Sequence, residues 1–176
     1  QLVQFILKEP LQVCWGDRFL IQDDSESVIL GGGTVLNPHA PQSHKRQPLR
    51  LARLREMNRQ QPAEILRAWL EMEGPPIDLN EFKAAINLQD VELDAVLALP
   101  ALATHMRVRK ANGDCLLTQE AWISRRDTLY QQVSDWHVAH PMDAGMAQAR
   151  LLQVPGGPLP AAFAVATLEA LLQEKR

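Results

Sequence analysis

The sequence predicts a mainly α-helical protein with a small β part in its N-terminal region. Residues 1–38 contain short apolar runs separated by turn-forming residues, which is typical of strands. From residue 48 onward, apolar residues recur every three or four positions, which is typical of amphipathic helices. The 176 residues are 46% hydrophobic and carry a net charge of −3, so the composition is that of a folded protein rather than a disordered one.

The β part is predicted to contain three strands, at Leu2–Leu7, at residues 18–21 and at residues 28–36. Gly16-Asp17 and the polar residues 22–27 supply the turns between them. The run Gly31-Gly32-Gly33 predicts a bulge, or a place where another group comes very close, because glycine has no side chain to pack. Three strands bury little apolar surface, so we expect them to pack on the helical part or to pair with another copy of the chain.

A basic segment, residues 41–61, connects the β part to the helices. Residues 41–60 contain six Lys and Arg residues and a single Glu, whereas the remainder of the chain is acidic. Pro48 suits the first turn of a helix predicted at residues 49–59. We therefore treat this segment as a linker followed by a helix.

Residues 62–117 are predicted to form a winged helix-turn-helix domain. Helices are expected at residues 63–73, 79–87 and 91–99, with Asp78 and Asp90 at the starts of the second and third. Residues 106–110 and 115–117 flank an Asn-Gly turn, which is a strong hairpin signal. Helices followed by a β-hairpin in this order indicate the winged form of the motif.

Residues 118–176 are predicted to repeat this pattern as a second winged-helix domain whose wing is missing. Thr118 is the expected N-cap of a long helix, Gln119–His140, and shorter helices are expected at 142–152 and 159–173. The apolar spacing predicts which residues form the cores of the two domains. They are Ile65, Leu66, Trp69, Leu70, Phe82, Ile86, Val96 and Leu97 in the first and Trp122, Leu129, Trp136, Phe163 and Leu168 in the second.

Two sequence segments resemble a known family. Cys14-Trp15-Gly16-Asp17-Arg18-Phe19-Leu20-Ile21 is similar to a segment of the third, β-barrel domain of EF-Tu-like translation factors. Gly31-Gly32-Gly33-Thr34-Val35-Leu36-Asn37-Pro38, followed by a basic linker and small helical modules, resembles the bacterial selenocysteine-specific elongation factors. The sequence departs from the family pattern at Gln22, where Arg is usual, and at Ile29-Leu30, where the usual form is shorter.

The resemblance implies a division of the chain and a function. Residues 1–40 would be the closing strands of the barrel, and residues 62–117 and 118–176 would be the first two winged helices of an arm. That arm would link the GTP- and tRNA-binding body of a cytoplasmic factor to the module that binds the mRNA hairpin. Selenocysteinyl-tRNA, the mRNA selenocysteine-insertion hairpin and the ribosome would be the partners. GTP and magnesium would bind a domain upstream of this piece, which itself has no predicted cofactor.

Seven basic residues are candidates for non-specific contact with an RNA backbone, because guanidinium and ammonium groups bind phosphates. Four lie in the basic segment and three in the predicted wing: Lys45, Arg46, Arg50, Arg53, Arg107, Arg109 and Lys110. An equally open interpretation is that the basic segment docks on acidic residues of the β part, namely Asp23, Asp24 and Glu26. For the wing residues, ordinary solvation is the simpler interpretation.

Catalytic and metal sites are not predicted. His137 and His140 have a spacing that could hold a metal, but no third strong ligand follows them. Cys14 and Cys115 lack a neighbouring base that would activate a thiol. No run of about 18 apolar residues is present, so no membrane span is expected.

A DNA-binding transcriptional regulator is the alternative function, because winged helices commonly bind DNA. The helix expected to read bases would be residues 91–99, and that stretch carries Glu92 and Asp94 but no Lys or Arg. This acidic composition favours the translation-factor interpretation.

Overall fold

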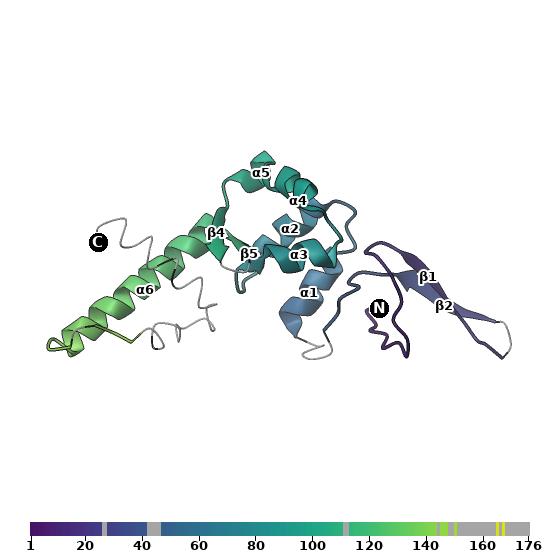
Figure 1. Cartoon of the computed structure of the whole chain (residues 1–176), viewed down its shortest axis with the longest axis horizontal. Helices are drawn as coiled ribbons and strands as arrows, with labels where there is room; N and C mark the ends of the chain where they lie inside the picture. The colour runs from purple at the N-terminus through teal and green to yellow at the C-terminus, as the bar shows by residue number, and fades with distance from the viewer. Residues whose placement is uncertain are drawn as a thin grey trace. The chain divides into compact units, whose positions relative to one another are not determined.

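The architecture is described from a computed structural model (Figure 1). It describes residues 1–25, 28–41, 47–110, 113–143, 145–147, 150, 165 and 167, excluding the side chains of residues 109 and 110. The chain divides into two compact units. The first contains Gln1–Met72 and Glu81–Leu102, and the second contains Glu73–Asn80 and Ala103–Arg176. Residues of the predicted 62–117 module therefore contribute to both units.

The β part of the first unit is a hairpin of β1 (Arg18–Gln22) and β2 (Ile29–Thr34). The strands are antiparallel, with Arg18 opposite Thr34. The register shifts between Ile21, which faces Gly31, and Gln22, which faces Ile29, so the pairing is irregular at Leu30, next to the glycine run.

The glycine run lies where the strands approach closely, as its composition predicts. A Cβ atom at Gly33 would lie 2.8 Å from Cζ of the Phe19 ring. A Cβ atom at Gly32 would lie 2.6 Å from the backbone oxygen of Phe19. A side chain at Gly32 would require the backbone of the neighbouring strand to shift, whereas a side chain at Gly33 would require the Phe19 ring to move.

The strand predicted at Leu2–Leu7 is wrong, because that segment forms no strand in the structure. Side chains hold it instead: the Gln4 amide donates to the Pro41 carbonyl at 3.2 Å, and the Phe5 and Phe19 rings meet edge to face at 5.6 Å. An apolar run becomes a strand only when a neighbouring strand offers its backbone groups, and that partner is not visible in local sequence.

The helices of the first unit are α1 (Pro48–Glu56), α2 (Pro62–Leu70) and α4 (Asp90–Leu97). Most of α3 (Leu79–Ala85) also belongs to this unit, and α5 (Pro100–Ala103) begins at its end. Proline occupies the first turn of α1 and α2, as expected. The core of the unit consists of buried side chains from α2 to α5, from the C-cap of α1 and from the residue after α3: Met57, Ile65, Leu66, Trp69, Leu70, Phe82, Ala85, Ile86, Leu93 and Leu102.

Helix α4 differs from its prediction in two respects. Val96 and Leu97, predicted in the core, are only half-buried, and Leu93 is the buried residue of this helix. The N-cap is Gln89 rather than Asp90, and the Gln89 backbone N–H donates to the Glu92 carboxylate at 2.8 Å. The short apolar run left the rotation of the helix undetermined, and packing against α2 decided it.

The second unit contains a three-stranded antiparallel sheet in the order β3 (Ile77–Asp78), β5 (Gly113–Leu117), β4 (Met106–Lys110). The β4–β5 hairpin confirms the Asn-Gly prediction, and Gly113 has a φ of +117°. Strand β3 was not predicted, because two residues are too few to show alternation. Asp78 acts as the expected cap of α3: its carboxylate accepts the backbone N–H of Asn80 at 2.9 Å.

Helix α6 (Gln119–Ala139) confirms the long helix predicted after Thr118, whose hydroxyl accepts the Ala121 N–H at 3.1 Å. Val108, Leu117, Trp122 and Leu129 form its core with the sheet. Trp136, predicted in the core, is only half-buried. Residues Met142, Asp143 and 145–147 are not helical, so the predicted 142–152 helix is wrong there. Arg150 is helical, and the other residues of that predicted helix lie outside the described residues, as do Phe163, Leu168 and nearly all of 159–173.

Candidate nucleic-acid interface

Helix α1 presents the arginines of the basic segment, and the structure describes Arg50 and Arg53 of the four candidates there. Lys45 and Arg46 lie outside the described residues. Arg50 is half-buried as a residue, and its guanidinium donates from Nη1 to the Pro41 carbonyl at 3.4 Å. Arg50 therefore contacts the end of the preceding linker while part of its side chain faces solvent.

Arg53 packs against the helical module. Its guanidinium carbon lies 5.2 Å from the centre of the Trp69 ring, within cation–π distance. Burial lowers the pKa of Arg53, and the negative charge of Glu81 acts in the opposite direction. The Arg53 Nε atom is buried without a hydrogen-bond partner. These contacts give Arg53 a packing role between α1, α2 and α3 and leave it little reach toward a phosphate.

Two further arginines of α1 and its C-terminal end lie at the surface. Arg55 is exposed. Arg59 donates from Nε to the Glu56 carboxylate at 2.6 Å, and this hydrogen bond, with the charge of Glu56, raises the pKa of Arg59. Arg55 was not selected from the sequence. The helical period would have shown that it lies away from Arg53, since two residues apart correspond to opposite faces of a helix.

Of the three candidates in the predicted wing, the structure describes the side chain of Arg107. Its Nε donates to the Asp114 carboxylate at 2.5 Å across the β4–β5 hairpin, and 47% of the Arg107 side chain remains exposed. Arg109 and Lys110 belong to β4, but their side chains lie outside the described residues. The Arg107 charge is therefore partly neutralised by its own hairpin.

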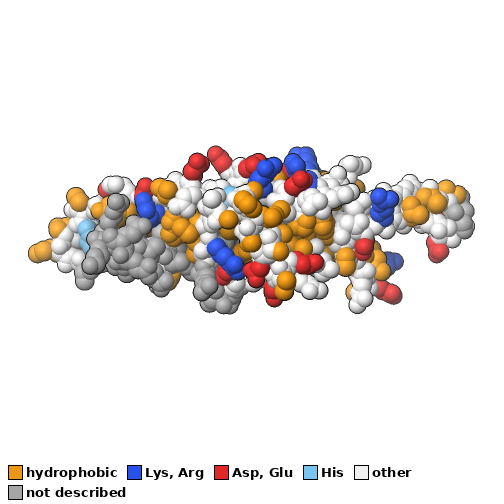
Figure 2. All heavy atoms as spheres, turned by 90° about the horizontal axis from the view of Figure 1, so that it is seen from above, with side chains coloured by type: hydrophobic (Ala, Val, Ile, Leu, Met, Phe, Trp, Pro, Cys, Tyr) orange, Lys and Arg blue, Asp and Glu red, His pale blue; other side chains and the backbone are white. Residues whose placement is uncertain are grey.

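The candidate base-reading helix α4 is acidic and exposed. Asp90, Glu92 and Asp94 all lie at the surface, and Asp90 accepts a salt bridge from Lys83 at 2.5 Å. Figure 2 shows acidic and basic side chains interspersed on the face viewed, with no continuous basic stripe there. An acidic helix repels the phosphate backbone that flanks a DNA groove.

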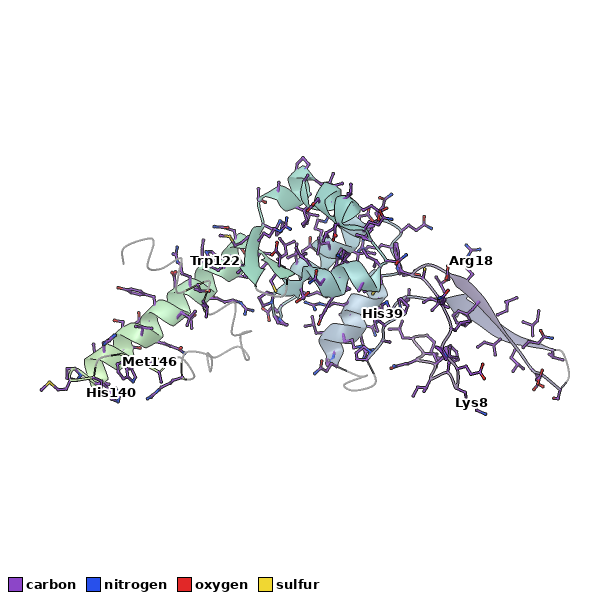
Figure 3. All side chains as sticks on the ribbon, viewed as in Figure 1. Lys8, Arg18, His39, Trp122, His140 and Met146 are labelled. Atoms are coloured by element: carbon purple, nitrogen blue, oxygen red, sulfur yellow. The ribbon has the colours of Figure 1, made fainter. Side chains whose placement is uncertain are left out.

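The histidines and cysteines are held in structural contacts. Figure 3 shows His140 at the end of α6 near Met146. The His140 ring stacks on Trp136 at 4.8 Å, and its Nδ1 lies 3.0 Å from the Trp136 carbonyl oxygen. Cys115 is buried in the sheet, and Cys14 is exposed. Within the described part of the chain, no group of three metal-binding side chains occurs.

The N-terminal segment is similar to a translation-factor β-barrel domain. Residues 1–42 match the family model of the selenocysteine-specific elongation factor, beta-barrel domain. This match supports the resemblance predicted from the Cys14–Ile21 and glycine-rich segments. It extends over the β part and does not reach the helices. No curated protein matches the chain. Among the helices described, none is long and apolar enough to cross a membrane.

Proposed function

We propose that this chain is part of a selenocysteine-specific translation elongation factor. It would form the arm that links the GTP- and tRNA-binding body to the module that binds the mRNA hairpin. The observation that carries the proposal is the match of residues 1–42 to the beta-barrel domain of that factor. The helical elements follow the matched segment directly, as they do in the family.

The order of elements supports winged-helix identity for the first helical module. Helix α2, strand β3, helices α3 and α4, the short helix α5 and the hairpin β4–β5 follow one another along the chain. A three-stranded antiparallel sheet built from β3, β5 and β4 is what a winged helix-turn-helix requires. The acidic surface of α4 disfavours the alternative of a DNA-binding regulator. We propose a second winged helix from residue 118 onward on the sequence pattern alone.

In this proposal the chain itself performs no catalysis and holds no cofactor. GTP and magnesium would act in a domain elsewhere in the same factor, and the factor would work in the cytoplasm with selenocysteinyl-tRNA, the mRNA hairpin and the ribosome. The sequence of the complete gene tests this directly. We expect it to encode a GTP-binding domain before the residue numbered Gln1; a complete gene without such a domain would contradict the proposal.

We further propose that this arm contacts RNA only through phosphates, without base recognition. We assign this contact to Arg55 of α1, which is exposed, and to Arg50, which also donates to the Pro41 carbonyl, together with Lys45, Arg46, Arg109 and Lys110 from the sequence prediction. Arg53 and Arg107 are engaged by Trp69 and Asp114 and contribute less. Phosphate contacts release counterions, so affinity should fall steeply as salt rises.

A salt titration of RNA binding tests the phosphate contact. We expect weak binding to structured RNA, similar for unrelated sequences. Replacing Arg50→Gln and Arg55→Gln together should weaken it and reduce the slope of log K against log salt by up to about 2, because two phosphate contacts are lost.

The matched control is Arg67→Gln with Arg126→Gln, which removes the same charge from α2 and α6. Arg67 and Arg126 are paired with Glu71 and Asp127. If the control weakens binding as much as the α1 pair does, only net charge matters. If neither pair changes binding, α1 makes no phosphate contact.

A further inference from the structure

The turn at Cys14–Asp17 is fixed rigidly to the β hairpin. The Cys14 N–H donates to the Asp17 carboxylate at 2.7 Å, and Gly16, with a φ of +88°, donates to the Val35 carbonyl at 2.9 Å. The Val35 N–H in turn donates to the Asp17 carbonyl at 2.8 Å. Glycine suits this left-handed position because a Cβ atom would strain it.

This turn presents Trp15 to the end of helix α1. The Trp15 indole N–H donates to the Met57 carbonyl at 2.8 Å. Met57 is the C-cap of α1 and is only 2% exposed. The last carbonyls of a helix have no partner within the helix, so an external donor there is a substantial gain.

A second tryptophan, from α2, donates a hydrogen bond to the previous turn of α1. The Trp69 indole N–H, from α2, donates to the Arg53 carbonyl at 3.1 Å. The end of α1 is therefore held by two indole groups, one from the β part and one from the helical core. The neighbouring contact is weaker: the Asn87 amide, which follows α3 and has a φ of +54°, donates to Cys14 Sγ at 3.6 Å.

We propose that the Cys14–Asp17 turn is a rigid joint, with Trp15 as its principal bond, that makes the β hairpin and the helices of the first unit move as one body. Without it, the described connections that remain are the linker chain itself, the contact of Gln4 with residues 40 and 41, and the contact of Arg50 with Pro41. The joint would transmit the orientation of the barrel segment to the first part of the arm. This inference does not depend on RNA contact by α1.

Residual dipolar couplings of the whole chain, measured by NMR without RNA, test the joint. In the wild type, the amides of β1–β2 and those of α1, α2 and α4 should fit a single alignment tensor. Trp15→Ala should require two tensors. Trp15→Phe keeps an aromatic ring but removes the indole N–H that bonds the Met57 carbonyl. The backbone amides of Met57, Asn58 and Arg59 should then exchange with solvent about five- to tenfold faster than in the wild type.

Trp136→Phe is the matched control, since Trp136 is a half-buried tryptophan of the second unit. It should leave both measurements unchanged. Two tensors in the wild type would overturn the proposal, as would a Trp15→Ala variant that keeps one tensor with wild-type exchange. If Trp15→Ala fails to fold, Trp15→Phe decides: unchanged exchange at Met57–Arg59 rejects the joint, and faster exchange supports it.

Discussion

At the scale of single residues, a sequence pattern shows the burial of Trp69 but not its two contacts with Arg53. The apolar spacing of α2 predicts its burial, and the structure confirms it at 8% exposure. The spacing does not show that its ring receives the Arg53 cation or that its N–H reaches the Arg53 carbonyl, 16 residues earlier in the chain. Charge in the sequence is enough to select candidate RNA-binding residues, but it does not show which of them are already in contact with other parts of the folded chain.

Trp69→Ala should lower the free energy of unfolding by about 3–5 kcal/mol, because the ring is buried and meets Phe82 at 5.3 Å. Trp69→Phe retains most of the apolar area and should cost less. Chemical denaturation followed by circular dichroism measures both. An alanine variant with an unchanged midpoint would contradict the role of Trp69 in the core.

Gly32→Ala should destabilise the β1–β2 hairpin, because the new methyl group would collide with the backbone oxygen of Phe19. Gly31→Ala is the matched control, since no atom lies within 4 Å of a Cβ placed there. Hydrogen exchange of the β1 and β2 amides measures the difference. Equal protection in the two variants would show that the strands do not lie as close as described.

At the scale of elements, the chemistry of helix ends and turns allowed most of the helices and one hairpin to be predicted. Proline at the start of α1 and α2, Thr118 before α6 and the Asn-Gly turn between β4 and β5 all act locally, so the sequence reveals them. Leu2–Leu7, β3 and the rotation of α4 depend on distant partners. The strand at Leu2–Leu7 was wrong, β3 was missed and the buried face of α4 was not determined, because strand pairing and packing are not local properties.

Thr118→Ala should lower stability by about 1 kcal/mol, because it removes the hydroxyl that accepts the Ala121 N–H at the start of α6. The control is Thr128→Ala within the same helix. The Thr128 hydroxyl donates to the Ser124 carbonyl, which is also the acceptor position of the regular helix hydrogen bond. Loss of this hydroxyl should therefore change stability little. Thermal unfolding compares them; equal shifts would contradict a specific cap.

At the scale of the whole molecule, the family match and the helices occupy different parts of the chain. The match ends at residue 42, before the first described residues of the basic helix. The proposal that the helices belong to the arm of the same factor therefore depends on element order and on the Trp15 contact to α1, in addition to the match. Predicting that contact from sequence would have required knowing which surface faces the Cys14–Asp17 turn.

Deleting residues 1–38 should leave the helices folded, because their core residues come from position 57 onward. We expect the helical circular dichroism signal to persist and the melting temperature to fall, since the Met57 carbonyl loses its indole donor. Loss of the helical signal would show that the helices depend on the β part.

The exposed apolar side chains of the β part have a thermodynamic consequence. Leu20, Ile29 and Leu30 are 62–73% exposed, and within the described residues β1 and β2 pair only with each other. If copies associate through this hairpin, water released from apolar groups drives the association, and that force weakens on cooling. The sedimentation coefficient at a fixed concentration, corrected for solvent viscosity and density, should then rise on warming from about 5 to 25 °C and rise again with added sulfate. The sign of this temperature dependence distinguishes apolar pairing from association through charges, which added salt would weaken.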